Sequence, residues 1–427
     1  MTRTRALAAC SVTLAVSATL TSQASAQSCP PPSTYEITDL GTLGGNDSFA
    51  LDINAAGQIV GGARAADTSL QPFLYETGPM VSLGTLGGSF GIAAGINASG
   101  QVAGQSFDAS GQRRAFLWSG GIMQDLGTLG GSNAQATGLN DSADVVGSAF
   151  TSGDLQQHAF LYRNGSMTDL GTLGGATSSA NAINASGQIV GWSHTAVSAG
   201  FHAFVSSGGP MALIPTLGGT LNNAFGQNDQ GHVVGWSNVA GDASFHGYLY
   251  ADGVLSELGT LGGVYSLASA ISNSGQIVGW AELAGGTDHA SVFVGGVAQD
   301  LNDLLPAGSG WELTYAAGVN GVGKIVGWGQ VGGERHGFLL TPSPSGMIGR
   351  LIALVQTFGL PQGTENSLLA KLQNAQSSTD GCNPNGACGQ LGAFINAVGA
   401  QSGKKLTVDQ ANELIAGAEQ VRAALGC

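Results

Sequence analysis

The chain has 427 residues, of which 71 are glycine and only 9% are charged. Disorder is excluded in spite of the glycine, because 43% of the residues are hydrophobic and they recur with a fixed spacing. A net charge of −14 argues against nucleic acid and anionic membranes as partners.

The first 26 residues have the pattern of a secretory signal peptide. Arg3 and Arg5 precede an apolar run from Ala6 to Leu20, and Ala24-Ser25-Ala26 forms a small-residue cleavage site. After this segment no stretch has the ~18 consecutive apolar residues of a membrane span. We therefore expect a mature chain that is exported, either secreted or periplasmic.

From about residue 35 to residue 340, one segment recurs every 43 or 44 residues. Its clearest copy, Met167 to Phe204, holds a Thr-Leu-Gly-Gly core, an Ile-Asn-Ala-Ser-Gly-Gln-Ile-Val-Gly-Trp stretch and a His-Ala-Phe stretch. A period of this length indicates stacked copies of one supersecondary unit. The core threonine is Thr42, Thr85, Thr128, Thr172, Thr216 and Thr260, with Asp303 in a weakened seventh copy.

Each copy predicts four short strands, named a to d. In the clearest copy, strand a is Ala180 to Asn184 and strand b is Gln188 to Trp192. A variable loop leads to strand c, His202 to Val205, and a tight turn leads to strand d, Met211 to Thr216. Four antiparallel strands per repeat are typical of a propeller blade, and the repeats lack the 3.6-residue apolar period of helices.

Strands b and c each occur seven times, so the sequence predicts seven blades. A strand d comes first, at Tyr35 to Thr42, and the array ends on a strand c at Leu340. We therefore expect an all-β seven-bladed β-propeller over residues 27–341, with the N-terminal strand completing the last blade and leaving no open edge. An open β-solenoid is the alternative architecture.

The repeats resemble the HAF family of extracellular repeats, named for the His-Ala-Phe stretch present at His158 to Phe160 and His202 to Phe204. The resemblance covers about residues 35–340, with departures at Pro72 and Arg114. It implies repeats and export, and it implies no established activity.

Residues 342–346 are rich in proline and serine and predict a linker, followed by a helical module over residues 347–427. Apolar spacing predicts helices around Ile348 to Val355, Leu368 to Leu372 and Ala393 to Val398. Thr407 begins a capping box that predicts a fourth helix.

This region resembles a FIMAH-like helical module, which implies an accessory role at a cell surface or wall. The stretches that carry the resemblance are Leu360-Pro361-Gln362-Gly363, Ser367 to Leu372, Gly403 to Thr407 and Leu425-Gly426-Cys427.

Four cysteines remain after residue 26, and they allow three disulfide connectivities. We expect Cys388 to pair with Cys427, because Cys388 immediately precedes the third helix and Cys427 lies in a segment matching the module. Cys29 and Cys382 would then form the second pair.

The sequence predicts no catalytic residues, no metal and no cofactor. The strand-c histidines lie in different blades, about 10 Å or more apart, so they cannot share one ion. We expect each to bond within its own blade instead. Acids outside the repeat pattern, such as Glu282 and Asp288, have no evident partner carboxylate.

The loops between strands b and c vary most, and variable loops on a repeated scaffold are where binding residues gather. Tryptophans expected at the ends of strand b in four consecutive blades could stack on sugars or peptides, or pack between blades. The predicted ligand-binding residues are Trp192, Trp236, Trp280, Trp328, Asp154, Gln156, Glu282 and Asp288.

These features predict an exported, monomeric, non-catalytic binding protein with a protein or glycan partner at the cell surface. One alternative is a secreted hydrolase or lyase acting on polysaccharide. Another is a calcium-stabilised structural protein.

Overall fold

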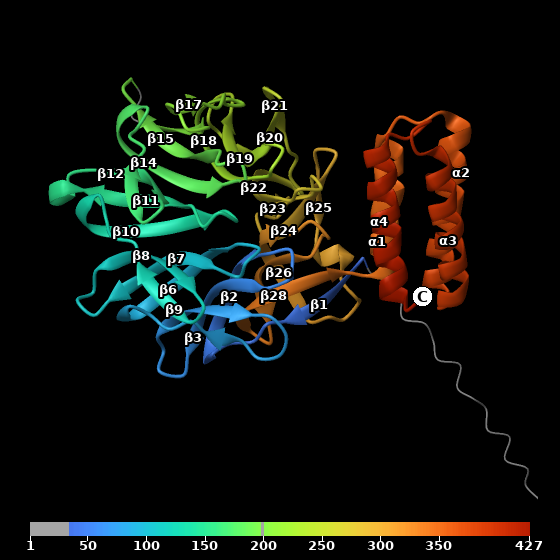
Figure 1. Ribbon diagram of the computed structural model, residues 1–427, viewed down its shortest axis with the longest axis horizontal. Helices are drawn as coiled ribbons and strands as arrows, with labels where there is room; N and C mark the ends of the chain where they lie inside the picture. Colours follow the sequence, from blue (N-terminus) through green and yellow to red (C-terminus); the bar gives the residue numbers. More distant parts are fainter. Residues whose placement is uncertain (1–33, 198–199) are drawn as a thin grey trace, which may run out of the picture. The chain divides into compact units, whose positions relative to one another are not determined.

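The computed structural model describes residues 34–197 and 200–427. The described chain is mostly β-sheet, with four helices near its C-terminus (Figure 1). The proposed signal peptide and Cys29 lie outside the described residues.

The strands form seven successive antiparallel units in the described chain, six of them contiguous in sequence. Unit 1 contains β2 (Gly44–Ile53), β3 (Ile59–Ala65), β4 (Leu70–Tyr75) and β5 (Val81–Ser82). Unit 2 contains β6 (Gly87–Ile96), β7 (Val102–Asp108), β8 (Arg113–Ser119) and β9 (Ile122–Asp125). Unit 3 contains β10 (Gly130–Leu139), β11 (Val145–Thr151), β12 (Gln157–Arg163) and β13 (Ser166–Asp169). Unit 4 contains β14 (Gly174–Ile183), β15 (Ile189–Thr195), β16 (Phe201–Ser206) and β17 (Ala212–Leu213).

Unit 5 contains β18 (Gly218–Gln227), β19 (Val233–Val239), β20 (Phe245–Ala251) and β21 (Val254–Glu257). Unit 6 contains β22 (Gly262–Ile271), β23 (Ile277–Leu283), β24 (Asp288–Val294) and β25 (Val297–Asp300). Unit 7 contains β26 (Trp311–Val319), β27 (Ile325–Val331), β28 (Glu334–Pro342) and, from the start of the chain, β1 (Tyr35–Asp39).

The N-terminal strand supplies the fourth strand of unit 7, as the order of the sequence motifs predicts. β1 pairs antiparallel with β28, from Tyr35 opposite Pro342 to Asp39 opposite Phe338. Unit 7 in turn contacts unit 1, where Asp47 of β2 pairs with Arg335 of β28.

A chain of side-chain amides links the units at the end of each strand a. The amide of one asparagine donates to the backbone carbonyl of the equivalent residue in the next unit, and Ser272 replaces asparagine in unit 6. The donor and acceptor pairs are Asn54 to Asn97 (2.9 Å), Asn97 to Asn140 (3.1 Å), Asn140 to Asn184 (3.3 Å), Asn184 to Asn228 (3.1 Å), Asn228 to Ser272 (3.3 Å) and Asn320 to Asn54 (3.1 Å). The last pair returns from unit 7 to unit 1.

The glycine of the Val-Gly-Trp stretch is required by an irregularity in strand a. In unit 4 the register between β14 and β15 shifts between Ala180 and Ala182. A Cβ added to Gly191 would lie 2.1 Å from the carbonyl oxygen of Ser179. Such a contact is far inside van der Waals distance, so only glycine fits.

Strand a is longer than predicted, because it includes the Gly-Gly of the repeat core. β14 begins at Gly174, which has φ +97°, and not near Ala180. A Cβ on Gly175 would lie 2.5 Å from the Cβ of His194 in strand b. Thr172 fixes this start, because its hydroxyl accepts from the Gly174 N–H (3.1 Å) and donates to the Gly175 carbonyl (2.9 Å).

The four predicted helices are present in the C-terminal module: α1 (Pro344–Thr357), α2 (Gln362–Asp380), α3 (Pro384–Gln401) and α4 (Val408–Leu425). The capping box is also confirmed, with reciprocal hydrogen bonds between Thr407 and Gln410. Fifteen buried residues drawn from all four helices and their connections form a single core.

The predicted linker over residues 342–346 is wrong. β28 ends at Pro342 and α1 begins at Pro344, so only Ser343 separates them. Ser343 caps the helix by accepting from the Gly346 N–H (3.0 Å). A serine followed by proline starts a helix as readily as it marks a linker, and composition alone does not separate the two cases.

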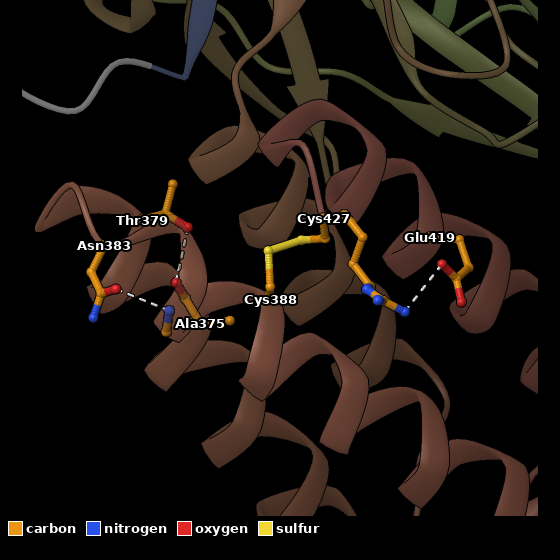
Figure 2. The surroundings of a disulfide bond; sticks show 8 residues. Ala375, Thr379, Asn383, Cys388, Glu419 and Cys427 are labelled. Carbon is orange, nitrogen blue, oxygen red and sulfur yellow. Dashed lines mark hydrogen bonds and ion pairs between the residues drawn. A yellow bond between two sulfur atoms is a disulfide. The ribbon is translucent and has the colours of Figure 1, made fainter.

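The disulfide predicted between Cys388 and Cys427 is present, with the two Cα atoms 5.9 Å apart (Figure 2). It joins the first turns of α3 to the second residue after the end of α4. Cys382 is also disulfide-bonded. Its predicted pairing with Cys29 stays a prediction, because Cys29 is not among the described residues.

Candidate functional site

The connections between strands gather on two opposite faces of the repeat array. On the first, the b–c loop of unit 3 meets the start of strand a, where Asp154 accepts from the Ser132 N–H (2.6 Å). On the second, Arg163 at the end of strand c pairs with Asp144 in the a–b turn (2.7 Å). We call these the loop face, which carries the b–c loops, and the turn face, which carries the a–b and c–d turns.

Histidines at the start of strand c pair with acids at the end of strand d in the same unit. The ring Nδ1 and carboxylate pairs are His158 with Asp169 (2.8 Å), His289 with Asp300 (2.6 Å), His336 with Asp39 (2.9 Å) and His246 with Glu257. The expectation of bonds within one blade is confirmed for these four residues. Among residues 34–197 and 200–427, no group of three or more histidine, cysteine, aspartate or glutamate residues could hold a metal ion.

The tryptophans do not end strand b, contrary to the sequence prediction. Trp192 lies in the middle of β15, which continues to Thr195 because His194 still pairs with Phe201 of β16. Trp236, Trp280 and Trp328 hold the same place in their strands.

Three of these tryptophans belong to a continuous series of half-buried rings across units 4, 5 and 6, which we call the aromatic chain. It consists of Trp192, Phe201, Trp236, Phe245, Trp280 and Tyr265. Its ring centroids lie 5.5 Å apart for Trp192–Phe201, 5.9 Å for Phe201–Trp236, 5.1 Å for Trp236–Phe245, 6.0 Å for Phe245–Trp280 and 4.7 Å for Phe245–Tyr265. The chain crosses two unit boundaries, so its rings also serve packing between units.

Trp328 is separate from this chain. It stacks on Tyr315 with centroids 4.2 Å apart and meets Phe49 of unit 1 at 6.1 Å. The structure therefore brings three of the four predicted tryptophans together.

The predicted polar residues form two groups in different units. Asp154 and Gln156 lie in unit 3, where the Gln156 side-chain oxygen contacts Nε2 of His158 (3.1 Å). Glu282 and Asp288 lie in unit 6 and face each other across β23 and β24, a pairing that the sequence did not indicate. Partial burial and the Glu282 charge raise the pKa of Asp288.

Exposed aliphatic side chains on the loop face were missed by the sequence reasoning. Leu155 is 83% exposed, Val197 96% and Val264 54%. Val264 adjoins Tyr265 of the aromatic chain, and its N–H donates to Glu282 (2.7 Å). For Leu155 and Val197, an apolar residue within a variable b–c loop would have been the available signal.

The turn face carries a central cavity of about 290 Å³ that sequence reasoning also missed. Its lining comes from the end of strand a and the following turn in all seven units, including Asn54, Asn184 and Asn320. A second cavity, of about 380 Å³, lies beside Asp144 and Arg163. No single repeat shows the central cavity, because it exists only where the seven units meet.

No protein-family model matches this chain, and no curated protein does. Among solved structures, TolB from Acinetobacter baumannii is 12% identical, with a TM-score of 0.40 over 67% of this chain and 64% of TolB. AofleA from Arthrobotrys oligospora is 13% identical, with a TM-score of 0.36 over 62% and 88%. A lectin from Aleuria aurantia in complex with Fucα1-6GlcNAc is 11% identical, with a TM-score of 0.34 over 72% and 93%.

This chain thus spans less than two thirds of TolB's length. Within the described part of the chain, no helix is long and apolar enough to cross a membrane.

Proposed function

We propose that the chain is a closed seven-bladed β-propeller of the HAF type with a FIMAH-like helical module, exported from the cell. Closure is supported by the pairing of β1 with β28 and by the amide of Asn320, which donates to Asn54 as the other asparagines donate to their successors. Export is supported by the N-terminal segment of the sequence and by the Cys388–Cys427 disulfide, since disulfides persist in oxidising compartments.

We further propose that the protein is a non-catalytic binding protein whose partner is a cell-surface glycan. The observation that carries this proposal is the aromatic chain on the loop-face side of units 4 to 6. Phe201 and Phe245 are the first residues after their b–c loops, and the rings are only half-buried. Partly exposed rings can stack on the apolar faces of sugars.

The surroundings of the aromatic chain narrow the type of glycan. Glu282 follows Trp280 by two residues on β23, so both side chains project from the same side of the strand. Carboxylates accept hydrogen bonds from hydroxyl or ammonium groups. The acidic surface of the protein repels acidic polysaccharides. A neutral or amine-bearing glycan therefore fits best.

The test is a glycan and peptidoglycan pull-down with the mature chain, followed by titration of the best binder. We expect Val264→Ser, and the double variant Glu282→Gln with Asp288→Asn, to weaken binding about tenfold, equal to about 1.4 kcal/mol. The matched control is Val254→Ser in β21, where the valine is 63% exposed but lies on the outer strand. An equal loss of binding affinity in Val254→Ser would refute the glycan proposal. A pull-down in which the mature chain retains proteins and no glycan would also refute it.

One observation favours the alternative of a polysaccharide-active hydrolase. Glu282 and Asp288 are directly opposite each other, and a raised pKa on one of two carboxylates is a feature of glycosidases. Release of reducing ends from the retained glycan, abolished by Glu282→Gln, would support this second function.

A further inference from the structure

At the rim of the central cavity, backbone N–H groups are directed from each unit toward the next. The group belongs to the first residue after the asparagine or serine that follows strand a. In three units this N–H donates a hydrogen bond to a side-chain oxygen of the equivalent residue in the next unit. The pairs are Ala98 with Asp141 (2.8 Å), Ala185 with Asp229 (2.9 Å) and Asp229 with Asn273 (2.9 Å).

Four units lack this internal acceptor: unit 3, where the donor of Asp141 faces Ala185, and the three consecutive units 6, 7 and 1. In the three consecutive units the donors belong to Asn273, Gly321 and Ala55, which face Gly321, Ala55 and Ala98 respectively. None of these facing residues has a side-chain oxygen. Among the described residues no hydrogen-bond acceptor pairs with these three N–H groups, and all three residues are exposed and line the cavity. We call these three donors the open arc.

Two cations lie against the same part of the rim. The Lys324 ammonium lies over the unit 1 turn, where a Cβ on Gly57 would be 3.4 Å from it. Arg350 of α1 donates to the carbonyl of Val322 (2.6 Å), next to Gly321, and to the side-chain oxygen of Gln276 (3.0 Å).

Neither cation forms a salt bridge with any carboxylate among the described residues. Lys324 is also the only lysine between residues 34 and 343. The opposite side of the rim carries the carboxylates of Asp141 and Asp229. Two cations thus lie near the open arc in a protein that is otherwise strongly acidic.

We propose that the open arc binds the carboxylate of a small organic acid. Elsewhere on the rim the same donor is satisfied twice by an aspartate carboxylate of the protein itself, which shows that a carboxylate oxygen fits there. A group of unpaired backbone N–H donors with cations beside it selects an anion. A cavity of about 290 Å³ holds one small ligand. This site lies on the turn face and is independent of the glycan surface proposed on the loop face.

The test compares D-glucuronate with D-glucose, a pair of probes that differ by the carboxylate, in calorimetric titrations of the mature chain. We expect glucuronate to bind, to raise the melting temperature and to bind more weakly as salt is added. Glucose should bind at least about tenfold more weakly. Equal binding of the two sugars, or no effect of glucuronate, would overturn the proposal.

Variants locate the site on the rim. Ala55→Asp and Ala98→Asp each place a carboxylate opposite a donor of the open arc, copying Asp141 and Asp229, so we expect the fold to persist and glucuronate binding to fall about tenfold or more. Ala185→Asp is the matched control, because it adds the same charge on the same rim opposite the isolated donor of Asp141, outside the open arc. It should leave affinity within about twofold.

Lys324→Gln provides a second measurement that adds no carboxylate to the rim. It should weaken glucuronate binding and reduce its dependence on salt. An Ala185→Asp loss as large as that of Ala55→Asp, or unchanged binding in Lys324→Gln, would contradict the site.

Discussion

The repeat array and the helical module are stabilised in different ways. The apolar clusters of the array are small and shared by neighbouring units; one of them joins Val146 and Ala159 of unit 3 to Ala180 and Phe204 of unit 4. The module instead has one core that all four helices share. A unit of the array therefore cannot bury its own apolar surface alone, whereas the module is self-sufficient. Changes at a unit boundary should spread through the array, and changes in the module should stay local.

Removing β1 should have the largest effect and gives the strongest test of this difference. Deletion of residues 34–40 leaves one edge of β28 unpaired and removes Tyr35 and Leu40 from two apolar clusters of the array. We expect the array to lose its cooperative unfolding transition, a loss of about 5 kcal/mol or more. Circular dichroism should still show helical signal, because the module core contains no residue of β1. An unchanged melting temperature of the array would disprove closure through β1.

Removing the Cys388–Cys427 disulfide should affect only the module. The two cysteines are 39 residues apart, and opening a loop of that length costs about 3–4 kcal/mol. The double variant Cys388→Ser with Cys427→Ser should lower the melting temperature of the helices and leave that of the strands unchanged. A shift in the melting temperature of the strands would instead show that the two regions unfold together.

The pH dependence of stability tests the contact that Asp52 makes across the boundary between units 1 and 2. Its carboxylate accepts from the N–H groups of Ile96 in unit 2 (2.9 Å) and Ile53 (2.8 Å), and burial raises its pKa from 3.8 to about 6. The folded chain thus holds this proton to higher pH than the unfolded chain. Its contribution to stability is therefore greatest below about pH 4 and falls by about 1–3 kcal/mol as pH rises through 6.

The variant Asp52→Asn should remove this part of the pH dependence from melting curves recorded between pH 4 and 7. Asp67→Asn is the control, because hydrogen bonds from Ser69 lower the pKa of Asp67. The stability that Asp67 contributes is lost only as pH falls below its unfolded value near 3.8, so this variant should keep the slope between pH 4 and 7. Retention of the slope in Asp52→Asn would refute the assignment.

The features predicted correctly from the sequence are those that a single repeat or helix determines. Thr407 and Gln410 carry a capping box within four residues, and strand counting placed β1 opposite β28. The errors arose where pairing between strands or between units decides the outcome. β14 begins at Gly174, which pairs with Thr195 of β15, and the central cavity needs all seven units. Pairing of Glu282 with Asp288 depends on the register of β23 and β24, which the variable loop between them conceals.

The smallest expected effect concerns one hydroxyl in the array. Tyr248 of unit 5 is fully buried in a cluster shared by units 4 and 5, and its hydroxyl has no hydrogen-bond partner among the described residues. The equivalent residue in five other units is phenylalanine: Phe73, Phe116, Phe160, Phe204 and Phe338. A buried hydroxyl without a partner costs free energy that phenylalanine avoids. We expect Tyr248→Phe to stabilise the array by about 1 kcal/mol, measured by denaturant unfolding at constant m-value.

The reverse change in the neighbouring unit, Phe204→Tyr, should destabilise the array by at least as much, since it adds the same unpaired hydroxyl to a packed site. If Tyr248→Phe destabilised the protein instead, the hydroxyl would have to bind a partner such as a buried water, and the site would differ from its five phenylalanine equivalents.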